Sequence, residues 1–231
     1  MTGNQDDSPG GYASPPCFMH EVDPVYMGLA EAADPRQRAD VMRWRKAERE
    51  RLIKARLAMP SDLRREFGRR IADHLEESIG QVAGLVVSAY WPFRGEPDLR
   101  AFLQRVVEHG GRTALPVVVQ RAAPLVFRAW AQGEPLEKGV WNIPVPTERA
   151  EEVIPDIVIA PVVGFDPSCY RLGYGGGFYD RTLAALPRRP RVFGVGYSQA
   201  AISTIYPQPH DIALDVIVTE NGTVTPRGAE E

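Results

Sequence analysis

The sequence predicts an α/β fold: an open, largely parallel sheet with helices on both faces, in a three-layer, Rossmann-like arrangement. Three observations lead to this prediction. Short apolar runs typical of buried strands alternate with segments of helical periodicity. A glycine-rich segment follows one such run and precedes a helical segment, where folds of this class bind ligands. The chain has 231 residues, 44% of them hydrophobic, which is enough for one sizeable core.

The first 40 residues differ from the rest, so we treat residues 1–40 as an N-terminal arm and residues 41–231 as one α/β domain. The arm is rich in Gly, Pro, Asp and Ser and has no apolar period, which is typical of a disordered tail. Its segment Cys-Phe-Met-His at 17–20 is apolar enough to dock on the domain or on another subunit. Cys17 and His20 are too few ligands for a metal site.

Two helices are expected at the start of the domain. Residues 44–59 are rich in Arg and Lys, and the sequence Pro-Ser-Asp at 60–62 ends this helix and begins the next. The second helix extends to about Ser78, because its apolar residues recur at helical spacing. These residues are Leu63, Phe67, Ile71 and Leu75.

The remaining elements follow from shorter patterns. A helix is expected at 98–109, closed by Gly110 and Gly111. Residues 141–146 contain two prolines and are expected to be extended. Apolar or alternating runs predict the strands, which are expected at 85–90, 113–119, 125–130, 157–165, 192–197 and 216–219.

Composition excludes several classes of protein. A formal net charge of −3 argues against a general nucleic-acid binder. No apolar run reaches the roughly 18 residues of a membrane span, and the N-terminus lacks the pattern of a signal peptide. Two cysteines without metal spacing favour a reducing compartment. We therefore expect a cytoplasmic protein with no nucleic-acid or membrane partner, either a monomer or a small homo-oligomer.

The most informative segment is Arg-Leu-Gly-Tyr-Gly-Gly-Gly-Phe-Tyr-Asp-Arg at 171–181. Its glycines allow a sharp turn and close approach to a ligand, and the helix expected at 182–186 adds an N-terminus that favours anions. Arg171, Asp180 and Arg181 flank the glycines with groups suited to phosphate and a metal ion. The segment fits neither the dinucleotide fingerprint, which needs glycine where Phe178 stands, nor the Walker A loop.

Four other segments carry candidate site residues, each with a structural alternative. In the basic helix, Arg45 and Arg49 share a face and either straddle a triphosphate or are solvated. After the strand at 85–90, Glu96 either recognises a flat heterocycle or, like Asp98, favours a helix start. Trp141 either supports a lid or contacts a ligand. Asp211 is expected in a loop, where an isolated Asp usually caps a helix or forms a turn, beside the loop histidine His210.

The glycine segment, with Gly-Phe-Asp at 164–166 before it, resembles the signature of the 5-formyltetrahydrofolate cyclo-ligase (methenyltetrahydrofolate synthetase) family. Phe178 stands where the family has tyrosine, and Gly176 stands where some members have lysine. The resemblance extends over residues 44–220. It implies ATP as co-substrate and Mg²⁺ as metal.

The resemblance also implies roles for individual residues. Arg171 and Tyr179 would be catalytic, and Asp180 and Asp211 would bind the metal. The ATP site would comprise Arg45 or Lys46, Arg49, Arg171, Leu172, Gly173, Tyr174, Gly175, Gly176, Gly177, Phe178 and Tyr179. The folate site would comprise Trp91, Glu96, Tyr174, Gly175, Gly176, Gly177 and Phe178.

The implied activity is ATP-dependent cyclisation of 5-formyltetrahydrofolate to 5,10-methenyltetrahydrofolate, with release of ADP and phosphate, by a ligase of folate one-carbon metabolism. Phosphoryl transfer to the formyl oxygen makes a poor leaving group a good one. Such chemistry needs positioning and charge neutralisation more than acid–base groups. Two alternatives stay open: an ATP-dependent ligase or phosphotransferase of the same fold in another cofactor pathway, and a non-catalytic folate- or nucleotide-binding regulator.

Overall fold

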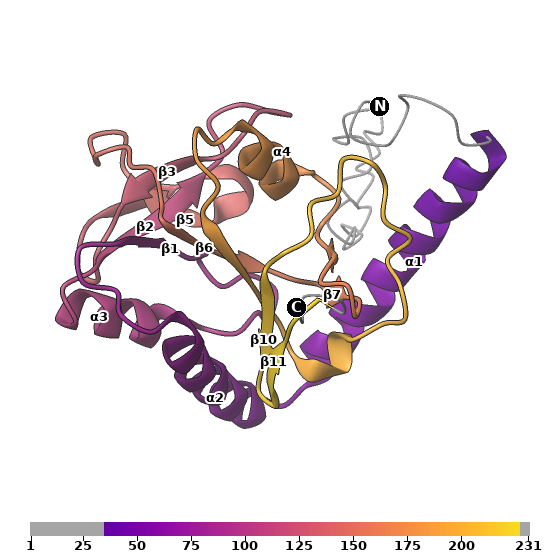
Figure 1. The fold of residues 1–231 in the computed structure, drawn as a ribbon, viewed down its shortest axis with the longest axis horizontal. Coiled ribbons are helices and arrows are strands. Elements are labelled where there is room, and N and C mark those ends of the chain that lie inside the picture. Colours follow the sequence, from indigo (N-terminus) through magenta and orange to yellow (C-terminus); the bar gives the residue numbers. More distant parts are fainter. Residues whose placement is uncertain (1–34, 227–231) are drawn as a thin grey trace, which may run out of the picture.

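The computed structural model describes residues 35–226 and contains a seven-stranded sheet in the order β11-β10-β9-β6-β1-β2-β3 (Figure 1). The strands β10, β9, β6, β1 and β2 are parallel, whereas β11 and β3 pair antiparallel at the two edges. In sheet order the bounds are Gly222–Val224, Val216–Thr219, Arg191–Val195, Ile157–Pro161, Val86–Ser88, Arg112–Val117 and Val126–Ala129. The predicted fold class is confirmed.

Helices cover both faces because side chains of the central strands alternate between two apolar clusters. Ile157 and Ile159 of β6 belong to the cluster with α2 (Ser61–Ile79) and α3 (Arg100–Glu108). Val158, between them, belongs to the cluster on the opposite face. That second cluster also receives α4 (Phe178–Ala185) and residues of α1 (Pro35–Ala58), and Figure 1 shows α2 and α3 on the side of the sheet away from α4.

Two short hairpins and two 3₁₀ turns complete the fold of the described residues. The pair β7 (Gly164–Phe165) and β8 (Arg171–Leu172) directly precedes the glycine loop, residues 173–177. The pair β4 (Leu136–Lys138) and β5 (Pro144–Pro146) encloses the 3₁₀ turn η2 (Val140–Asn142), and η3 (Ser198–Ala200) follows β9. The predicted strand at 157–165 is therefore two strands, because the chain leaves the main sheet after Pro161.

Three other expectations need correction. α1 begins at Pro35, inside the expected arm and well before residue 44. Proline is favoured in the first helical turn, because backbone N–H groups there have no partner within the helix and the lack of one costs nothing. α4 begins at Phe178 rather than Thr182. Residues 141–146 are not extended throughout, because Trp141 has a φ of 59° and Asn142 a φ of 58°. Cys17, His20 and the rest of residues 1–34 lie outside the described residues.

None of the helices within residues 35–226 combines the length and apolar character needed to cross a bilayer.

Candidate functional site

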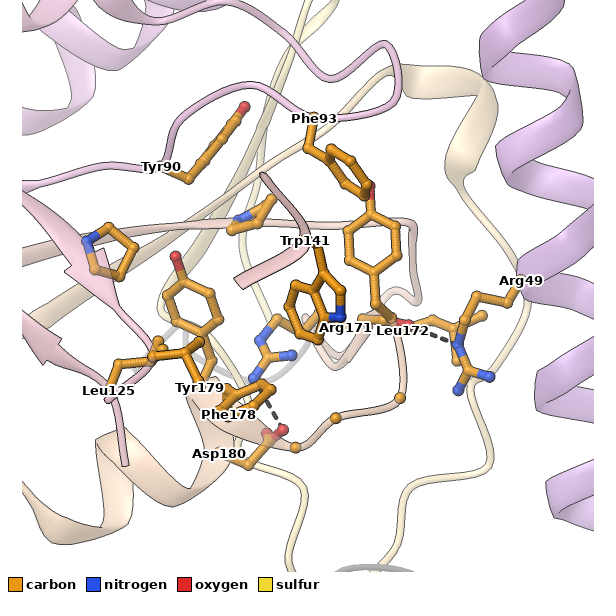
Figure 2. A pocket seen from close by; sticks show the side chains of 18 of the residues that line it. Arg49, Tyr90, Phe93, Leu125, Trp141, Arg171, Leu172, Phe178, Tyr179 and Asp180 are labelled. Carbon is orange, nitrogen blue, oxygen red and sulfur yellow. Dashed lines mark hydrogen bonds and ion pairs between the residues drawn. The ribbon is translucent and has the colours of Figure 1, made fainter. Parts of the chain in front are cut away.

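A cavity of about 240 Å³ lies at the carboxyl ends of the parallel strands, between α1 and the glycine loop. Its walls come from α1, the segments after β1 and β2, the η2 turn, the glycine loop and the loop before β10. Figure 2 shows Trp141, Phe178 and Tyr179 lying together beside Arg171, with Arg49 reaching in from α1. The cavity has the position expected for a ligand site in an open α/β sheet.

The β7–β8 hairpin positions the start of the glycine loop through Asp166. One oxygen of this buried carboxylate accepts the N–H groups of Ser168 and Tyr170, and the other accepts the N–H of Ile205. The tight turn that results delivers Arg171 and the loop to the cavity. At the other end, Gly177 has a φ of 62° and directly precedes the first residue of α4.

Arginines of α1 face the loop across the cavity. The Nε of Arg49 donates to the carbonyl of Gly173 at 2.6 Å. Gly175 has a φ of 100°, and a Cβ added to it would lie 3.5 Å from the Arg49 guanidinium carbon. Arg45 donates to Asp211 at 2.5 Å and to the carbonyl of Ile205 at 2.9 Å. Two guanidinium groups beside a glycine-rich loop suit a polyanion.

A buried ion pair lies under the loop. The Nη2 of Arg171 is 2.9 Å from Asp180, whose other oxygen accepts the N–H of Ile212. The Arg171 guanidinium also lies over the Tyr179 ring, 5.3 Å from its centre. Within residues 35–226 the buried Nε of Arg171 has no hydrogen-bond acceptor, which costs about 1–3 kcal/mol unless a ligand or water supplies one.

The opposite end of the cavity has aromatic walls and one buried acid. Tyr90, Trp91 and Phe93 follow β1 and line it. Glu96 is 7% exposed, and it accepts the Phe93 N–H at 2.8 Å and the Tyr174 hydroxyl at 2.8 Å. This end can hold a flat ring with N–H groups directed at the carboxylate.

Burial raises the pKa of Glu96 to about 6, although Arg56, the Phe93 N–H and the Tyr174 hydroxyl act to lower it. Glu96 is therefore close to changing charge just below neutral pH. The titratable and charged groups that interact with it come from α1, the segment after β1, the glycine loop, α4 and the segment after β9. They are Arg56, Tyr90, Tyr174, Tyr179 and Tyr197.

The model of the 5-formyltetrahydrofolate cyclo-ligase family matches residues 41–220. The chain belongs to this family. The 5-formyltetrahydrofolate cyclo-ligase of Mycolicibacterium smegmatis is 34% identical over 147 residues, which cover 60% of this chain and 75% of the relative. The cyclo-ligase of Escherichia coli is 28% identical over 170 residues, covering 71% and 93%.

Solved structures agree with the family assignment. The 5,10-methenyltetrahydrofolate synthetase of Aquifex aeolicus has a TM-score of 0.69 and 27% identity, covering 81% of this chain and 95% of that one. The synthetase of Mycoplasma pneumoniae has a TM-score of 0.62 at 21% identity, covering 76% and 98%, and supports the fold. The family predicted from the glycine segment is confirmed.

Most of the family-implied residues do line the cavity. They are Arg45, Arg49, Trp91, Glu96, Arg171, Leu172, Gly173, Tyr174, Gly175, Gly176, Gly177, Phe178, Tyr179, Asp180 and Asp211. Lys46 is not among the lining residues, so of these two adjacent cations the structure favours Arg45 as the one that faces the cavity. Leu172 is 1% exposed and its carbonyl accepts the Val163 N–H, so its side chain serves the core.

Other expected roles change with the geometry. Arg181 lies behind the loop, where it donates to the carbonyl of Gly176 and stacks over Phe178, so it supports the loop and does not line the cavity. Asp98 accepts the Arg100 N–H beside the start of α3, as predicted. His210, expected to be an ordinary loop residue, lines the cavity 3.8 Å from Asp211. Trp141 both lines the cavity and packs on Phe178, with the two ring centres 6.0 Å apart.

Sequence reasoning missed Arg56, which is buried behind Glu96 and Tyr174. A signal was present, because Arg56 lies seven residues after Arg49 and therefore on the same face of α1.

Asp180 and Asp211, the expected Mg²⁺ ligands, both line the cavity. Each carboxylate is paired with an arginine, and within residues 35–226 no cluster of three or more His, Cys, Asp or Glu could hold a metal. Mg²⁺ commonly binds through one or two carboxylates together with substrate phosphates and water. The residues therefore fit an ion that arrives with a polyphosphate, and do not form a complete site of their own.

We predict that Gly175→Ala weakens nucleotide binding, because the methyl group strains the backbone and faces Arg49. Gly133→Ala is the matched control: Gly133 has the same φ of 100° but nothing within 4 Å of an added Cβ. Both variants should lose about 1–2 kcal/mol of stability, measured by thermal melting. Titration with a non-hydrolysable ATP analogue should show weakened binding for Gly175→Ala alone, and equal affinities in the two variants would contradict the assignment of this loop.

Proposed function

We propose that this chain catalyses the ATP-dependent closure of 5-formyltetrahydrofolate to 5,10-methenyltetrahydrofolate, with release of ADP and phosphate. The observation that carries the proposal is a single cavity with two chemically different ends. One end has the glycine loop facing Arg45, Arg49 and Arg171, and the other has aromatic walls around Glu96. Membership of the cyclo-ligase family supports the same reaction.

The triphosphate is placed against the glycine loop. Backbone N–H groups of the loop and the start of α4 contact its oxygens, and the guanidinium groups of Arg45, Arg49 and Arg171 neutralise its charge. The Arg171 Nε, which lacks an acceptor among the described residues, then gains one. Gly176 leaves no cation at a position where some family members have lysine, and these arginines offset that loss.

The folate ring is placed between the aromatic walls, with its N–H groups directed at Glu96. The formyl oxygen then attacks the γ-phosphorus; the new P–O bond forms as the bond to ADP breaks. N10 next attacks the formyl carbon, its proton leaves, and the C–O bond to phosphate breaks as the ring closes. Positioning supplies most of the rate for such a reaction.

Two further roles concern the phosphoryl group. Burial raises the pKa of the Tyr179 hydroxyl, so this group stays protonated and can donate a hydrogen bond in the cavity. Arg171, which stacks on Tyr179, supplies positive charge next to it. Asp180 and Asp211 would hold Mg²⁺, which supplies charge neutralisation on the phosphates when bound.

A cytoplasmic location and a monomeric or small homo-oligomeric state stay predictions.

The direct test is the absorbance of the methenyl product on mixing the protein with Mg²⁺, ATP and 5-formyltetrahydrofolate. Product formation that requires ATP supports the proposal. Binding of both ligands without product would favour the non-catalytic regulator, and failure to bind the folate would favour a different substrate.

Arg45 and Lys46 allow a matched comparison of adjacent cations on α1. We expect Arg45→Ala to raise the KM for ATP by roughly 10- to 150-fold, the equivalent of the roughly 1.5–3 kcal/mol of a charged hydrogen bond. Lys46→Ala should leave it near the parent value, because Lys46 does not line the cavity. Steady-state kinetics with melting curves as a stability control measure both, and equal KM values in the two variants would exclude Arg45 from the ATP site.

The pKa of Glu96 predicts how folate binding depends on pH. The ionised carboxylate accepts the ring N–H groups, so binding should weaken as the pH falls below about 6 and the carboxylate becomes protonated. At pH 5 the Kd for 5-formyltetrahydrofolate, measured without nucleotide, should be about tenfold higher than at neutral pH. Glu96→Gln should bind weakly at every pH; a parent Kd that does not change between pH 7.5 and 5 would remove Glu96 from ring recognition.

A further inference from the structure

Arg56 lies in the last turn of α1 and is buried, yet it is not among the residues that line the cavity. Its Nε donates to the carbonyl of Arg94 at 3.0 Å, and its Nη2 donates to the Tyr174 hydroxyl at 2.5 Å. The same nitrogen is 4.0 Å from Glu96. Arg56 therefore contacts the segment after β1 and the glycine loop at once.

The direction of the hydrogen bonds is fixed by chemistry. A guanidinium only donates, so the Tyr174 oxygen accepts from Arg56 and its one hydrogen goes to Glu96 at 2.8 Å. Burial raises the pKa of Tyr174, which keeps the hydroxyl a donor. Glu96 is thus the acceptor at the end of a chain of two hydrogen bonds, in which each bond polarises the next.

This chain leaves Glu96 able to receive a ligand. One of its oxygens accepts from Tyr174 and the other from the Phe93 N–H. A carboxylate has about four lone-pair positions, so each oxygen can accept one further N–H. Two adjacent N–H donors on a flat ring match that capacity, with the carboxylate orientation set by Tyr174 and Phe93.

Tyr174 is also part of the phosphate-facing loop. Its neighbour Gly173 is held by Arg49, and its other neighbour Gly175 faces the same guanidinium. The Tyr174 ring packs against Phe93, with ring centres 5.9 Å apart. A shift of the loop backbone at Gly173 or Gly175 therefore moves the hydroxyl that orients Glu96.

We propose that Arg56 and Tyr174 are positioning residues that orient Glu96 and make folate binding and nucleotide binding favour each other. This inference rests on the proposed function. The first ligand to bind fixes the position of the glycine loop, and with it those of Tyr174 and Glu96, so the second ligand meets groups already placed for it. Because such coupling is reciprocal, nucleotide must tighten folate binding by the same factor as folate tightens nucleotide binding.

The test measures the Kd of 5-formyltetrahydrofolate with and without a saturating non-hydrolysable ATP analogue and Mg²⁺, and the converse titration. We expect the parent to show a ratio within the roughly 5- to 150-fold range of typical coupling. Tyr174→Phe, which loses one oxygen atom, should reduce the ratio to about one. Tyr170→Phe is the matched control, because Tyr170 packs on the core and does not line the cavity.

Arg56→Lys provides a second, independent variant. A single ammonium group cannot hold both Arg94 and Tyr174 as the planar guanidinium does, so the ratio should fall although the charge is kept. Arg105→Lys, whose side chain pairs with Glu76 on α2, is its control and should keep the parent ratio. Tyr174→Phe should also move the acid limb of folate binding to higher pH, since a hydrogen bond to the ionised Glu96 is lost.

The outcomes separate this inference from the proposed function. Methenyl product from the parent together with a ratio of one, or an unchanged ratio in Tyr174→Phe, overturns the inference alone. A parent that binds neither ligand overturns both. Melting curves confirm that the variants are folded; if Tyr174→Phe is not, the ratio in Arg56→Lys decides, and a parent-like value there overturns the inference.

Discussion

The glycine loop depends on the buried ion pair between Arg171 and Asp180, which joins the two ends of the loop. A loop with four glycines among its five residues would otherwise have many conformations, and fixing them is costly. The pair connects β8 to the first turn of α4, and Asp180 also holds the chain at Ile212. Removing one partner of such a pair leaves a buried charge and costs about 3–5 kcal/mol. The ion pair between Arg171 and Asp180 therefore both shapes the glycine loop and stabilises the part of the structure beneath it.

Guanidinium groups hold this loop from both sides. Arg49 and Arg56 approach it from α1, and Arg181 approaches it from α4. Backbone carbonyls of the loop point toward these arginines at Gly173 and Gly176, so the loop is anchored by its carbonyls. Because its carbonyls are anchored by arginines, this glycine-rich segment can keep one conformation and form a defined anion site.

Patterns in the sequence predicted the parts of the molecule that depend on local chemistry. The apolar runs predicted the central strands to within a few residues, and the spacing of Ile71 and Leu75 predicted α2. The break after Pro161 could not be predicted, because Val162 and Val163 are buried and continue the apolar run. The start of α4 was missed, because Phe178 and Tyr179 directly follow the glycines and were therefore assigned to the loop.

The candidate site was predicted less evenly than the fold. Arg45, Glu96 and Arg171 were predicted from local motifs together with the family resemblance, and all line the cavity. Arg56 was missed because its role comes from contacts with Arg94 and Tyr174, 38 and 118 residues away in the chain. The contact of Arg181 with the Gly176 carbonyl was missed for the same reason: sequence shows which groups are present and not the direction in which they point.

The length of α1 has a consequence for how the site tolerates change. Arg45 and Arg56 belong to one uninterrupted helix, so they are separated by about 16 Å along its axis and by a fixed rotation. A single residue inserted between them would turn Arg56 by about 100° away from Glu96 while leaving Arg45 in place. Substitutions on the outer face of α1 are therefore compatible with the site, whereas insertions and deletions within 46–55 are not.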